Sequence, residues 1–395
     1  MTETSSVPVT PYPANPWHSL FQRLLAAPDR MARGEPASHL ASAVYHDPSI
    51  HQAEQAALFR RLPLCLGHAD QLHEPGSVLA REITGIPLLL MRDANGEIGV
   101  FRNACRHRGA RLGPEDGALC TLTSLTCRYH GWTYDLDGNL VALPRRDAFP
   151  TLDRATRGLR RVPSTVHHGL IWAVLDPDAH AMPAMATYLG PLDAELAALG
   201  MGTQKFFRQH AVRRACNWKL IVDAFLEVYH VKRLHAGTIG PFFTDAKAAS
   251  DQFGPHQRML VGRDDLTAWR DLPPEQWNPQ QHGTLVHLIF PNSIIVYHPD
   301  YISHLGMFPT APDETLFVHT MLTPELPRDD KAKTHWERSF DLIDGEVFHG
   351  EDLFICEQIQ AGLASGANAD FLLGRLEDNV RHFHATVAAA LPPRG

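Results

Sequence analysis

Apolar positions follow two different patterns along the chain, and the change between them divides it into parts. From Arg61 to Leu175, short apolar runs alternate with turn-forming segments such as 93–96 and 135–139, which are rich in Asp, Asn and Gly. Apolar runs joined by such segments are typical of β-hairpins. We therefore predict an all-β domain of short strands over this stretch, preceded by a helix over 49–59.

The second half of the chain mixes helical and strand patterns. Apolar residues recur at helical spacing in four segments: 217–234, 331–344, 350–363 and 374–391. Four apolar runs of strand length also follow one another: 284–290, 293–297, 305–309 and 316–322. An antiparallel sheet with helices laid on one of its faces is an α+β arrangement, so α+β is the fold class that the pattern predicts.

These patterns predict three parts in the chain. Residues 1–40 are expected to be a Pro-rich N-terminal arm with a short helix over 17–26, one that wraps a neighbouring subunit. Residues 41–175 contain the all-β domain, and residues 176–395 contain the sheet with helices. The stretch 176–191 is rich in Pro and Ala, which is typical of a linker.

Composition narrows the function classes. The chain has 395 residues, a formal net charge of −8 and 44% hydrophobic residues, which suits an ordinary globular enzyme and argues against a nucleic-acid-binding surface. No apolar run approaches the roughly 20 residues of a membrane span. Residues 1–16 lack the charged start and apolar core of a signal peptide. We therefore expect a cytoplasmic protein with no membrane partner.

Two short clusters carry candidate metal chemistry: Cys105-Arg106-His107 and Cys127-Arg128-Tyr129-His130. Each offers one thiolate and one imidazole, and both fall on loops between predicted strands. Two Cys on one iron and two His on the other is the ligand set of a Rieske-type [2Fe–2S] centre. A structural zinc site with two Cys and two His is the alternative, although that pattern usually pairs Cys with Cys and His with His.

The other cysteines are expected to be buried small side chains, because a disulfide framework is unusual in a cytoplasmic chain. These are Cys65, Cys120, Cys216 and Cys356. Cys120 lies in the spacer between the two clusters and is the one that could sit near them.

A second candidate metal site lies downstream. Glu227 and His230 are three residues apart and would share one face of the predicted helix, and His235 can turn inward if that helix ends near Leu234. With the distant Asp352, two imidazoles and one carboxylate make a facial triad for Fe(II) and O₂. The alternative is that these are ordinary helix histidines.

The residues around both clusters resemble those of the Rieske non-haem iron oxygenases, in their α (terminal oxygenase) subunit. Cys105-Arg106-His107-Arg108-Gly109 and Cys127-Arg128-Tyr129-His130-Gly131-Trp132 are similar to the cluster loops of that family. The acid-x-x-His-x-x-x-x-His pattern over 227–235 and the segment 351–363 resemble its catalytic domain. The resemblance implies a Rieske domain followed by a helix-grip-like antiparallel sheet that carries a mononuclear iron.

By the same resemblance, individual residues receive roles. Cys105, His107, Cys127 and His130 would hold the [2Fe–2S] cluster. The mononuclear Fe(II) would be bound by His230, His235 and Asp352, with Glu351 as the rival to Asp352.

Two acids remain. Glu227 would be the bridging acid that contacts a Rieske histidine of the adjacent subunit in a trimer, and Asp223 would be a further catalytic acid. Most members carry Asp at the position of Glu227, and a Glu there resembles the branch acting on quaternary ammonium compounds such as carnitine and choline.

Three positions depart from the family pattern. Arg128 stands where a Pro is usual, and Ala224 follows Asp223 where Asn is frequent. The spacer between the two Cys/His clusters is a little longer than usual.

The implied function is that of a terminal oxygenase. Electrons from NAD(P)H would arrive through a partner reductase or ferredoxin, and O₂ would hydroxylate or demethylate a small organic substrate, an aromatic compound or a quaternary amine. A homotrimer is expected, with an α₃β₃ assembly as the alternative. The competing functions are a Rieske electron-transfer protein and a ligand-binding protein, both without oxygenase activity.

Candidates for the substrate pocket come from the helix and sheet around the second site. The expected lining is Phe225, Leu226, His287, Ile289, Ile295, Tyr297 and Phe308, with Phe242 and Phe243 on a lid. Five other histidines are expected to be plain surface or core residues: His167, His168, His282, His298 and His304.

Overall fold

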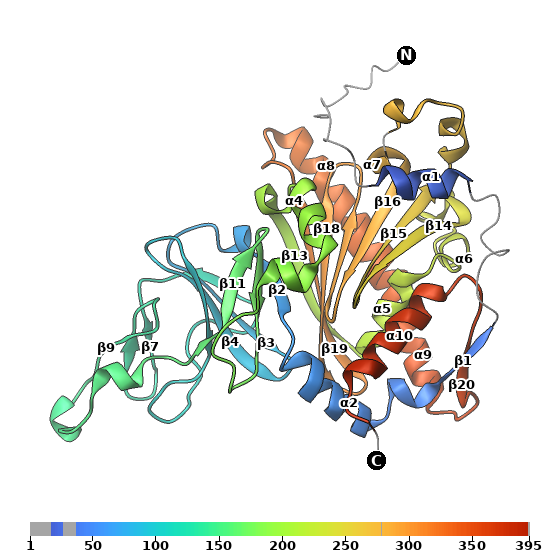
Figure 1. The fold of residues 1–395 in the computed structure, drawn as a ribbon. Coiled ribbons are helices and arrows are strands. Elements are labelled where there is room, and N and C mark those ends of the chain that lie inside the picture. The colour runs from blue at the N-terminus through green and yellow to red at the C-terminus, as the bar shows by residue number, and fades with distance from the viewer. Residues whose placement is uncertain (1–16, 27–36, 278, 394–395) are drawn as a thin grey trace.

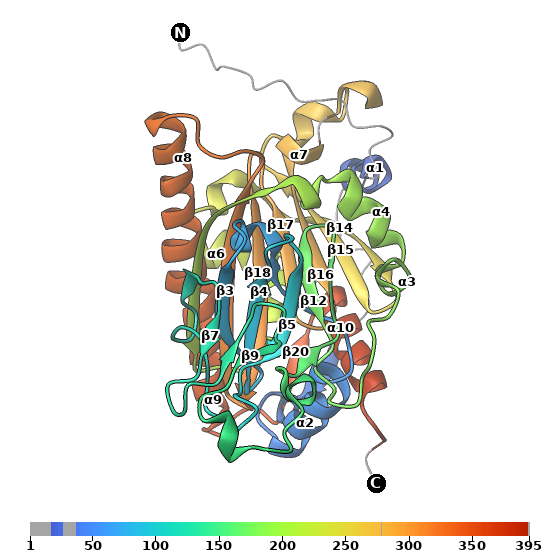
Figure 2. The same cartoon turned by 90° about the vertical axis from the view of Figure 1, so that its left-hand side faces the viewer.

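The computed structural model describes residues 17–26, 37–277 and 279–393, and its described chain has two parts that lie side by side (Figure 1). A β-rich part holds most of residues 61–175. A larger part is built on one broad antiparallel sheet with helices. When the molecule is turned so that the β-rich part faces the viewer, its strands lie in front of the large sheet (Figure 2).

Short strands make up the β-rich part, as the sequence pattern predicts. One sheet has the order β10-β5-β4-β3-β6, and two three-stranded sheets have the orders β11-β12-β2 and β7-β8-β9. The strands are β2 (Leu64–His68), β3 (Ser77–Ile83), β4 (Ile86–Arg92), β5 (Ile98–Arg102), β6 (Leu119–Thr121), β7 (Leu125–Thr126), β8 (Thr133–Tyr134), β9 (Leu140–Ala142), β10 (Arg161–Val162), β11 (Ser164–His167) and β12 (Leu170–Ala173).

The two predicted hairpin turns are closed by aspartates. Asp93 accepts hydrogen bonds from the backbone N–H groups of Asn95 and Glu97, both at 2.8 Å. Asp135 does the same for Asn139 at 2.7 Å. An Asp side chain that binds the backbone two to four residues later stabilises a tight turn, so both turns form as predicted.

The larger part is a seven-stranded sheet in the order β13-β19-β18-β17-β16-β15-β14, with every neighbouring pair antiparallel. Its strands are β13 (Lys205–Arg214), β14 (Phe243–Phe253), β15 (His256–Arg263), β16 (Gly283–Ile289), β17 (Ser293–Tyr297), β18 (Ile302–Ala311) and β19 (Glu314–Thr323). The four predicted strands correspond to β16–β19, and the α+β class is confirmed.

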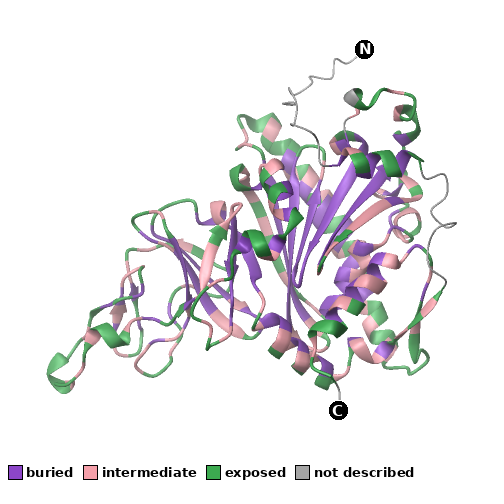
Figure 3. Cartoon of the chain, in the orientation of Figure 1, coloured by how far each residue is buried: buried purple, intermediate pink, exposed green. Residues whose placement is uncertain are grey.

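Helices cover both faces of this sheet, whereas the sequence pattern suggested one. On one face lie α5 (Trp218–Leu226), the π-helix η11 (Asp341–Asp352), α9 (Leu353–Leu363) and α10 (Asp378–Ala390). On the other lie α1 (His18–Ala26), α3 (Met185–Leu189) and α4 (Pro191–Ala198). The strands β15–β19 are therefore buried along most of their length (Figure 3), which is why β16–β19 appear in the sequence as nearly continuous apolar runs.

The remaining described elements are short, apart from α8. The helices and helical turns are η2 (Ser42–Tyr45), α2 (Pro48–Glu54), η3 (Gln55–Phe59), η4 (Ala69–Leu72), η5 (Arg146–Ala148), η6 (Arg154–Arg157), η7 (Met201–Thr203), α6 (Val231–Leu234), η8 (Gly240–Phe242), η9 (Leu266–Trp269), η10 (Pro274–Gln276), α7 (Pro279–His282) and α8 (Asp330–Phe340). Strands β1 (Ser38–Ala41) and β20 (Asp370–Leu373) pair with each other. Within the described chain no helix is both long and apolar enough to span a bilayer.

Three details differ from the predicted elements. The helix expected over 217–234 is interrupted between α5 and α6. The linker expected over 176–191 contains α3. Strands β13, β14 and β15 were not predicted: β13 and β14 are only partly buried and their apolar pattern is weak, and β15 is buried but has polar residues at His256, Gln257 and Arg258.

The N-terminal segments belong with the large sheet. Helix α1 forms as predicted, and its apolar face packs against β14 and β15 of its own chain. The rest of the predicted arm before residue 37 lies outside the described residues. Helix α2 and the turn η3 follow the predicted helix over 49–59, and they pack with α5 and α10 through contacts such as Phe59 on Trp218.

A buried ion pair joins α2 to α5. Lys219 Nζ lies 2.6 Å from Glu54 Oε1, and the two side chains are 1% and 0% exposed. The indole N–H of Trp218 donates to the other carboxylate oxygen of Glu54 at 2.9 Å. Both charges are thus compensated inside the core, where an unpaired one would be costly.

Removing one partner of this pair should destabilise the fold. We expect Glu54→Gln to lower the free energy of unfolding by about 3 kcal/mol, because the ammonium of Lys219 stays buried without its counter-charge. Urea unfolding followed by circular dichroism measures the change. Glu337→Gln is the matched control, since it breaks the exposed Lys333–Glu337 pair and should cost less than about 0.5 kcal/mol. Equal small losses in both variants would contradict the expectation.

Candidate metal centres and adjoining cavity

The two Cys/His loops of the β-rich part have the same backbone closure. The N–H of Cys105 and that of Cys127 each bind the carbonyl five residues later, both at 2.8 Å. Gly109 and Gly131 each donate back to the carbonyl of the preceding Cys, at 2.8 and 2.9 Å. Both glycines have positive φ, 78° and 71°, which a residue without Cβ adopts at least cost. The repeated closure places each pair of ligand candidates in the same way.

The four side chains are arranged as ligands of one centre would be. Nδ1 of His107 faces Nδ1 of His130 at 3.1 Å, a separation that suits two ligands of a single iron. Cys105 and Cys127 are 4% and 3% exposed. Desolvation and the facing His130 lower the pKa of His107, which favours the neutral imidazole that binds metals. These residues therefore fit a [2Fe–2S] centre with Cys on one iron and His on the other.

Two neighbours support this centre. The hydroxyl of Tyr134 lies 3.4 Å from Cys105 Sγ and accepts a hydrogen bond from the N–H of Arg106 at 2.9 Å. The indole of Trp132 stacks on the ring of His107. Hydrogen bonds to the sulfurs and the shielding of ligands are means by which proteins set a cluster's potential. Cys120 sits on β6, where its thiol lies 3.8 Å from the carbonyl of Val78.

The second site forms where the predicted helix breaks. Glu227 leaves the helix with an extended backbone, at φ −135° and ψ 167°. One oxygen of its carboxylate then accepts from the N–H groups of Tyr229 and His230, as a capping residue does for the turn that follows. The expectation that Glu227 and His230 share a helix face is thus wrong, because the carboxylate captures the free N–H groups of the next turn.

The break brings three ligand candidates together. His230 and His235 flank the short helix α6, and Asp352 is the last residue of the π-helix η11. Oδ1 of Asp352 lies 3.2 Å from Nε2 of His235 and 3.7 Å from Nε2 of His230. That oxygen is buried and makes no well-directed hydrogen bond. The two imidazoles thus converge on a buried carboxylate oxygen that has no other partner among the described residues. This set of ligands fits an Fe(II) ion with open coordination positions.

The other nitrogen of each imidazole is held by a carboxylate. Nδ1 of His230 binds Oε1 of Glu227, and Nδ1 of His235 binds Oε2 of Glu351 at 2.7 Å. Burial alone would lower the pKa of both rings, but the surrounding carboxylates raise it overall. Such partners orient a ligating histidine and fix its tautomer. Glu351, the rival to Asp352, therefore lies on the Nδ1 side of His235, away from the point where the Nε2 atoms converge.

Asp223 is engaged by other groups. Tyr45 donates its hydroxyl to Oδ2 of Asp223 at 2.6 Å, and Nε2 of His384 lies 3.0 Å from Oδ1. It lies on α5 about one turn before Glu227 and lines a cavity beside the iron-site residues. In the described part of the chain, Asp223 makes hydrogen bonds to Tyr45 and His384 but none to His230 or His235, and its catalytic role stays a prediction.

Two cavities adjoin the iron-site residues and share Ala224, Glu227, His230 and Asp352 in their walls. The inner one, of about 90 Å³, lies between the helices and the large sheet. Its remaining lining is almost entirely apolar: Phe225, Val228, Val231, Ile239, Phe243, Met259, Val261, Val286, Val296, Ile343, Val347 and Phe348, with Thr284, His235 and His298 as the polar members. The outer one, of about 450 Å³, also carries Asp223, Arg233 and Glu377.

Only part of the predicted pocket lining is right. Phe225 and Phe243 face the inner cavity, and Phe243 does so from the edge strand β14. Phe242 is half exposed at the end of a helical turn and does not line it. Six residues that were expected in the wall lie elsewhere in the core: Leu226, His287, Ile289, Ile295, Tyr297 and Phe308. On β16 and β17 the even-numbered Thr284, Val286 and Val296 point inward instead, because side chains alternate between the two faces.

Sequence reasoning missed a row of polar residues that begins at the inner cavity. His298 Nε2 lies 3.2 Å from Ser303 Oγ, and that hydroxyl lies 3.0 Å from His319 Nε2. His319 Nδ1 lies 2.9 Å from Asp344, whose other oxygen lies 2.8 Å from Nδ1 of the half-exposed His210. Isolated polar residues within apolar strand runs, such as Ser303 and His319, were the available signal.

Comparison with known families agrees with this arrangement. The Rieske [2Fe-2S] domain model matches residues 63–154, which contain the four cluster candidates, and the model of the ring hydroxylating alpha subunit (catalytic domain) matches 201–392, which contain the three iron candidates. The chain belongs to the Rieske ring-hydroxylating oxygenase family.

Relatives within the family differ in the substrates that their names give. Biphenyl 2,3-dioxygenase subunit alpha of Rhodococcus jostii (strain RHA1) is 36% identical over 193 residues. These residues are 47% of this chain and 41% of the relative, so the chain matches less than half of the relative's length. The carnitine monooxygenase oxygenase subunit of Escherichia coli (strain K12) is 26% identical over 360 residues, 87% of this chain and 91% of the relative.

Solved structures share the fold. The quaternary ammonium Rieske monooxygenase CntA in complex with L-carnitine matches with a TM-score of 0.74 and 20% identity over 94% of this chain and 99% of that one. Naphthalene 1,2-dioxygenase from Rhodococcus sp. bound to indole matches with a TM-score of 0.75 and 21% identity over 95% and 98%. At these identities the match establishes the architecture of a Rieske domain joined to a catalytic domain.

Metal analysis can assign the ligands of both centres. We expect about three irons and two acid-labile sulfides per chain in anaerobically purified protein, because a [2Fe–2S] cluster and one mononuclear iron are present. His235→Ala and Asp352→Ala should each remove one iron and leave the sulfide and the reduced-cluster EPR signal. Glu351→Gln should keep the iron but weaken its binding by about 10- to 100-fold.

The matched control for these variants is His335→Ala, which changes an exposed histidine paired with Asp300. It should leave all three irons in place. Loss of iron from Glu351→Gln but not from Asp352→Ala would reverse the assignment of the carboxylate ligand.

Proposed function

We propose that this chain is the terminal oxygenase component of a Rieske system, which uses O₂ and electrons from NAD(P)H, delivered by a reductase or ferredoxin, to oxidise a small organic substrate. The observation that carries the proposal is the convergence of His230, His235 and Asp352 beside an apolar cavity, in a chain that also holds a Rieske domain. An electron carrier or a ligand-binding protein, the alternative functions, would need no such triad of buried ligands.

The chain's own residues prepare the reaction. When bound, the cluster supplies single electrons and the mononuclear iron supplies the chemistry of O₂. Glu227 and Glu351 hold the tautomers of His230 and His235, so that both Nε2 atoms present lone pairs to one point. The apolar wall of the inner cavity keeps water away from that point.

Oxidation of a C–H bond by O₂ consumes two electrons and two protons besides the substrate, and it yields an alcohol and water. The polar row supports a route for these protons into the buried cavity. It runs from half-exposed His210 through Asp344, His319 and Ser303 to His298, with each step joined by a hydrogen-bond contact. A proton received at His210 can thus be passed inward by successive shifts along the row.

The electron path is proposed to cross between subunits of a homotrimer. In Figure 1, β7, which directly precedes the second cluster loop, lies toward the far end of the β-rich part, whereas α6, which His230 and His235 flank, lies in the larger part. The side chain of Glu227 is 14% exposed, and the nearby Tyr229 is 66% exposed, so Glu227 lies just below a surface that a neighbour's cluster histidine is proposed to approach. A similar structure, a quaternary ammonium Rieske monooxygenase, is described with inter-subunit electron transfer. An α₃β₃ assembly remains the alternative.

The proposed path makes Glu227 essential for electron transfer, in addition to its hydrogen bond to the iron candidate His230. We expect Glu227→Gln loaded with excess Fe(II) to contain both metal centres, with the mononuclear iron bound more weakly as in Glu351→Gln, and to slow reoxidation of the reduced cluster by O₂ and substrate about 10- to 100-fold. Stopped-flow absorbance of the cluster measures this rate. Glu377→Gln, which changes another acid of the outer cavity, is the control and should reoxidise at the wild-type rate. An unchanged rate in Glu227→Gln would remove it from the path.

Complementation tests the subunit boundary directly. Cys105→Ser chains would keep only the mononuclear iron, and His235→Ala chains would keep only the cluster. Neither homotrimer should turn over substrate, but trimers that contain both chains, coexpressed with different tags, should regain part of the activity. Mixed trimers without activity would place the whole path within one chain.

The inner cavity favours a small apolar ring over a betaine. Three phenylalanines and a set of aliphatic side chains form its wall, and among the lining residues no Lys or Arg is present to bind a substrate carboxylate. Apolar rings gain from burial and from edge or face contacts with Phe. We therefore expect substrate-stimulated O₂ uptake with small aromatic compounds, and none with carnitine, whose carboxylate would find no cationic partner in this wall. The reverse result would change the substrate class and leave the oxygenase proposal standing.

The alternation of side chains on β17 gives a matched pair of variants. Val296→Leu adds a methylene group to the wall of the inner cavity. It should raise the KM for whichever aromatic compound stimulates O₂ uptake. Ile295→Val changes the neighbouring residue, which packs on the opposite face of the sheet. It should cost about 1 kcal/mol of stability and leave KM unchanged. Equal effects on KM would argue that the inner cavity is not the substrate site.

A further inference from the structure

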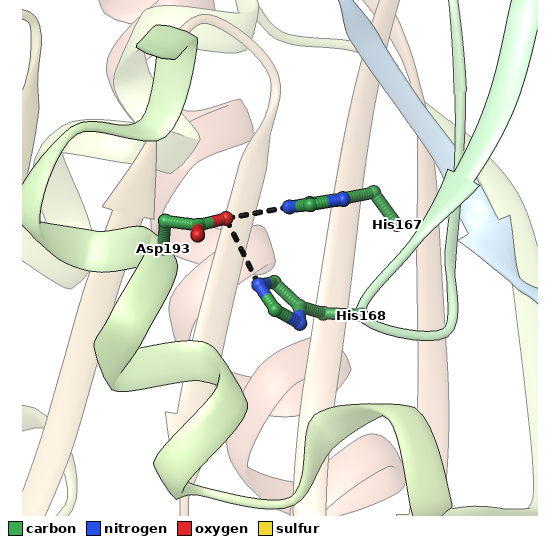
Figure 4. A group of neighbouring side chains, drawn as sticks. All are labelled: His167, His168 and Asp193. Carbon is green, nitrogen blue, oxygen red and sulfur yellow. Dashed lines mark hydrogen bonds and ion pairs between the residues drawn. The ribbon is translucent and has the colours of Figure 1, made fainter. Parts of the chain in front are cut away.

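A third group of metal-binding side chains lies apart from both iron centres. His167 and His168 come from the hairpin between β11 and β12, and Asp193 comes from the first turn of α4. Figure 4 shows both rings reaching the same carboxylate oxygen. Nε2 of His167 lies 2.5 Å and Nε2 of His168 lies 2.9 Å from Oδ1 of Asp193. One atom of each residue lies within 4.8 Å of the others.

The backbone of the hairpin explains how two neighbouring residues reach one point. Successive side chains in a strand point to opposite faces, but His168 has left-handed backbone geometry with φ 49°. The chain therefore turns at His168, and the two rings lie 4.2 Å apart between their centroids. Left-handed geometry is uncommon for residues other than Gly. Here it aligns two imidazoles toward the same partner.

The group is accessible to an ion from solution. The side chains of His167, His168 and Asp193 are 28%, 20% and 26% exposed, so they are neither free on the surface nor sealed in the core. Burial alone would raise the pKa of Asp193, but the hydrogen bonds from the two histidines lower it overall. The carboxylate is therefore ionised at neutral pH, and two imidazoles crowd one of its oxygens.

We propose that His167, His168 and Asp193 form a binding site for a divalent transition-metal ion with the preferences of Zn²⁺. Two imidazole nitrogens and one carboxylate oxygen are a common ligand set for zinc, with a water in the fourth position. Zinc bonds of about 2.0–2.2 Å place tetrahedral ligands roughly 3.3 Å apart. The two nitrogen–oxygen separations of 2.5 and 2.9 Å thus need to lengthen by less than about 1 Å to admit the ion, which small rotations of these partly exposed side chains allow.

The position of this site gives it a structural consequence. The hairpin β11–β12 belongs to the β-rich part, and α4 packs on the large sheet. An ion held by both would therefore join the two parts of the chain. None of its three ligands is one of the residues assigned to the iron centres. This inference does not depend on the proposed oxygenase activity.

Zinc titration of the iron-loaded protein tests the site. Isothermal titration calorimetry with ZnCl₂ should find one binding equivalent in the wild type that is absent from His168→Ala and from Asp193→Asn. His335→Ala, whose histidine pairs with a single aspartate, is the matched control and should keep that equivalent. Iron and sulfide content measured before and after titration shows that zinc has not replaced iron.

Thermal unfolding is a second measurement, for the case in which a variant is too unstable for calorimetry. Zn²⁺ should raise the unfolding temperature of the wild type and of His335→Ala, and should leave that of Asp193→Asn unchanged. Asp193→Asn keeps the size of the side chain and is expected to fold. The absorbance of its [2Fe–2S] cluster verifies that fold. If the variants bind the same number of zinc equivalents as the wild type, the three residues are a hydrogen-bonded contact between the two parts and the proposal is overturned.

Discussion

The iron site depends on the point at which α5 stops. At Glu227 the backbone turns from helical to extended, and the side chain satisfies the N–H groups of the next turn as well as the ring of His230. A continuous helix would leave the two histidines five residues apart on a rigid rod, pointing in different directions. Because one carboxylate both ends the helix and holds the first ligand, His230 and His235 can face Asp352 together.

A second constraint acts on the nitrogens of the histidines. Each imidazole can offer only one nitrogen to a metal, and the hydrogen bond at the other decides which one. In the catalytic domain, Glu227 and Glu351 occupy both Nδ1 atoms and leave Nε2 for the iron. In the Rieske loops the Nδ1 atoms of His107 and His130 face each other instead. If these residues hold the metals as proposed, the two centres would use opposite nitrogens of their histidine rings.

The large sheet sets the shape of the cavity beside the iron site. Because helices cover both of its faces, each strand contributes alternate side chains to two different interiors. One interior receives Val286 and Val296 and adjoins the iron ligands, while the other receives Ile289 and Ile295 and packs against α1 and α4. The polar row through Ser303 and His319 crosses the first interior and ties it to η11, the π-helix that carries Asp352. The interior between the sheet and η11 therefore both shapes the cavity and holds in place the helix that carries Asp352.

The amino-acid sequence by itself determined the chemistry of this protein and its broad architecture. The spacing of Cys105 with His107, of Cys127 with His130 and of Glu227 with His230 and His235 is local, and a short motif carries its ligands on one loop or turn. The hairpins at Asp93 and Asp135 and most helices were predicted for the same reason.

Only the tertiary structure decided three features. It placed Asp352 rather than Glu351 at the Nε2 atoms of the histidines, and the even-numbered rather than the odd-numbered residues of β16 and β17 in the cavity wall. It also brought Asp193 into contact with His167 and His168. Each of these depends on contacts between segments far apart in the sequence. In strands that are buried on both faces, apolar residues carry no periodic signal to reveal such contacts in advance.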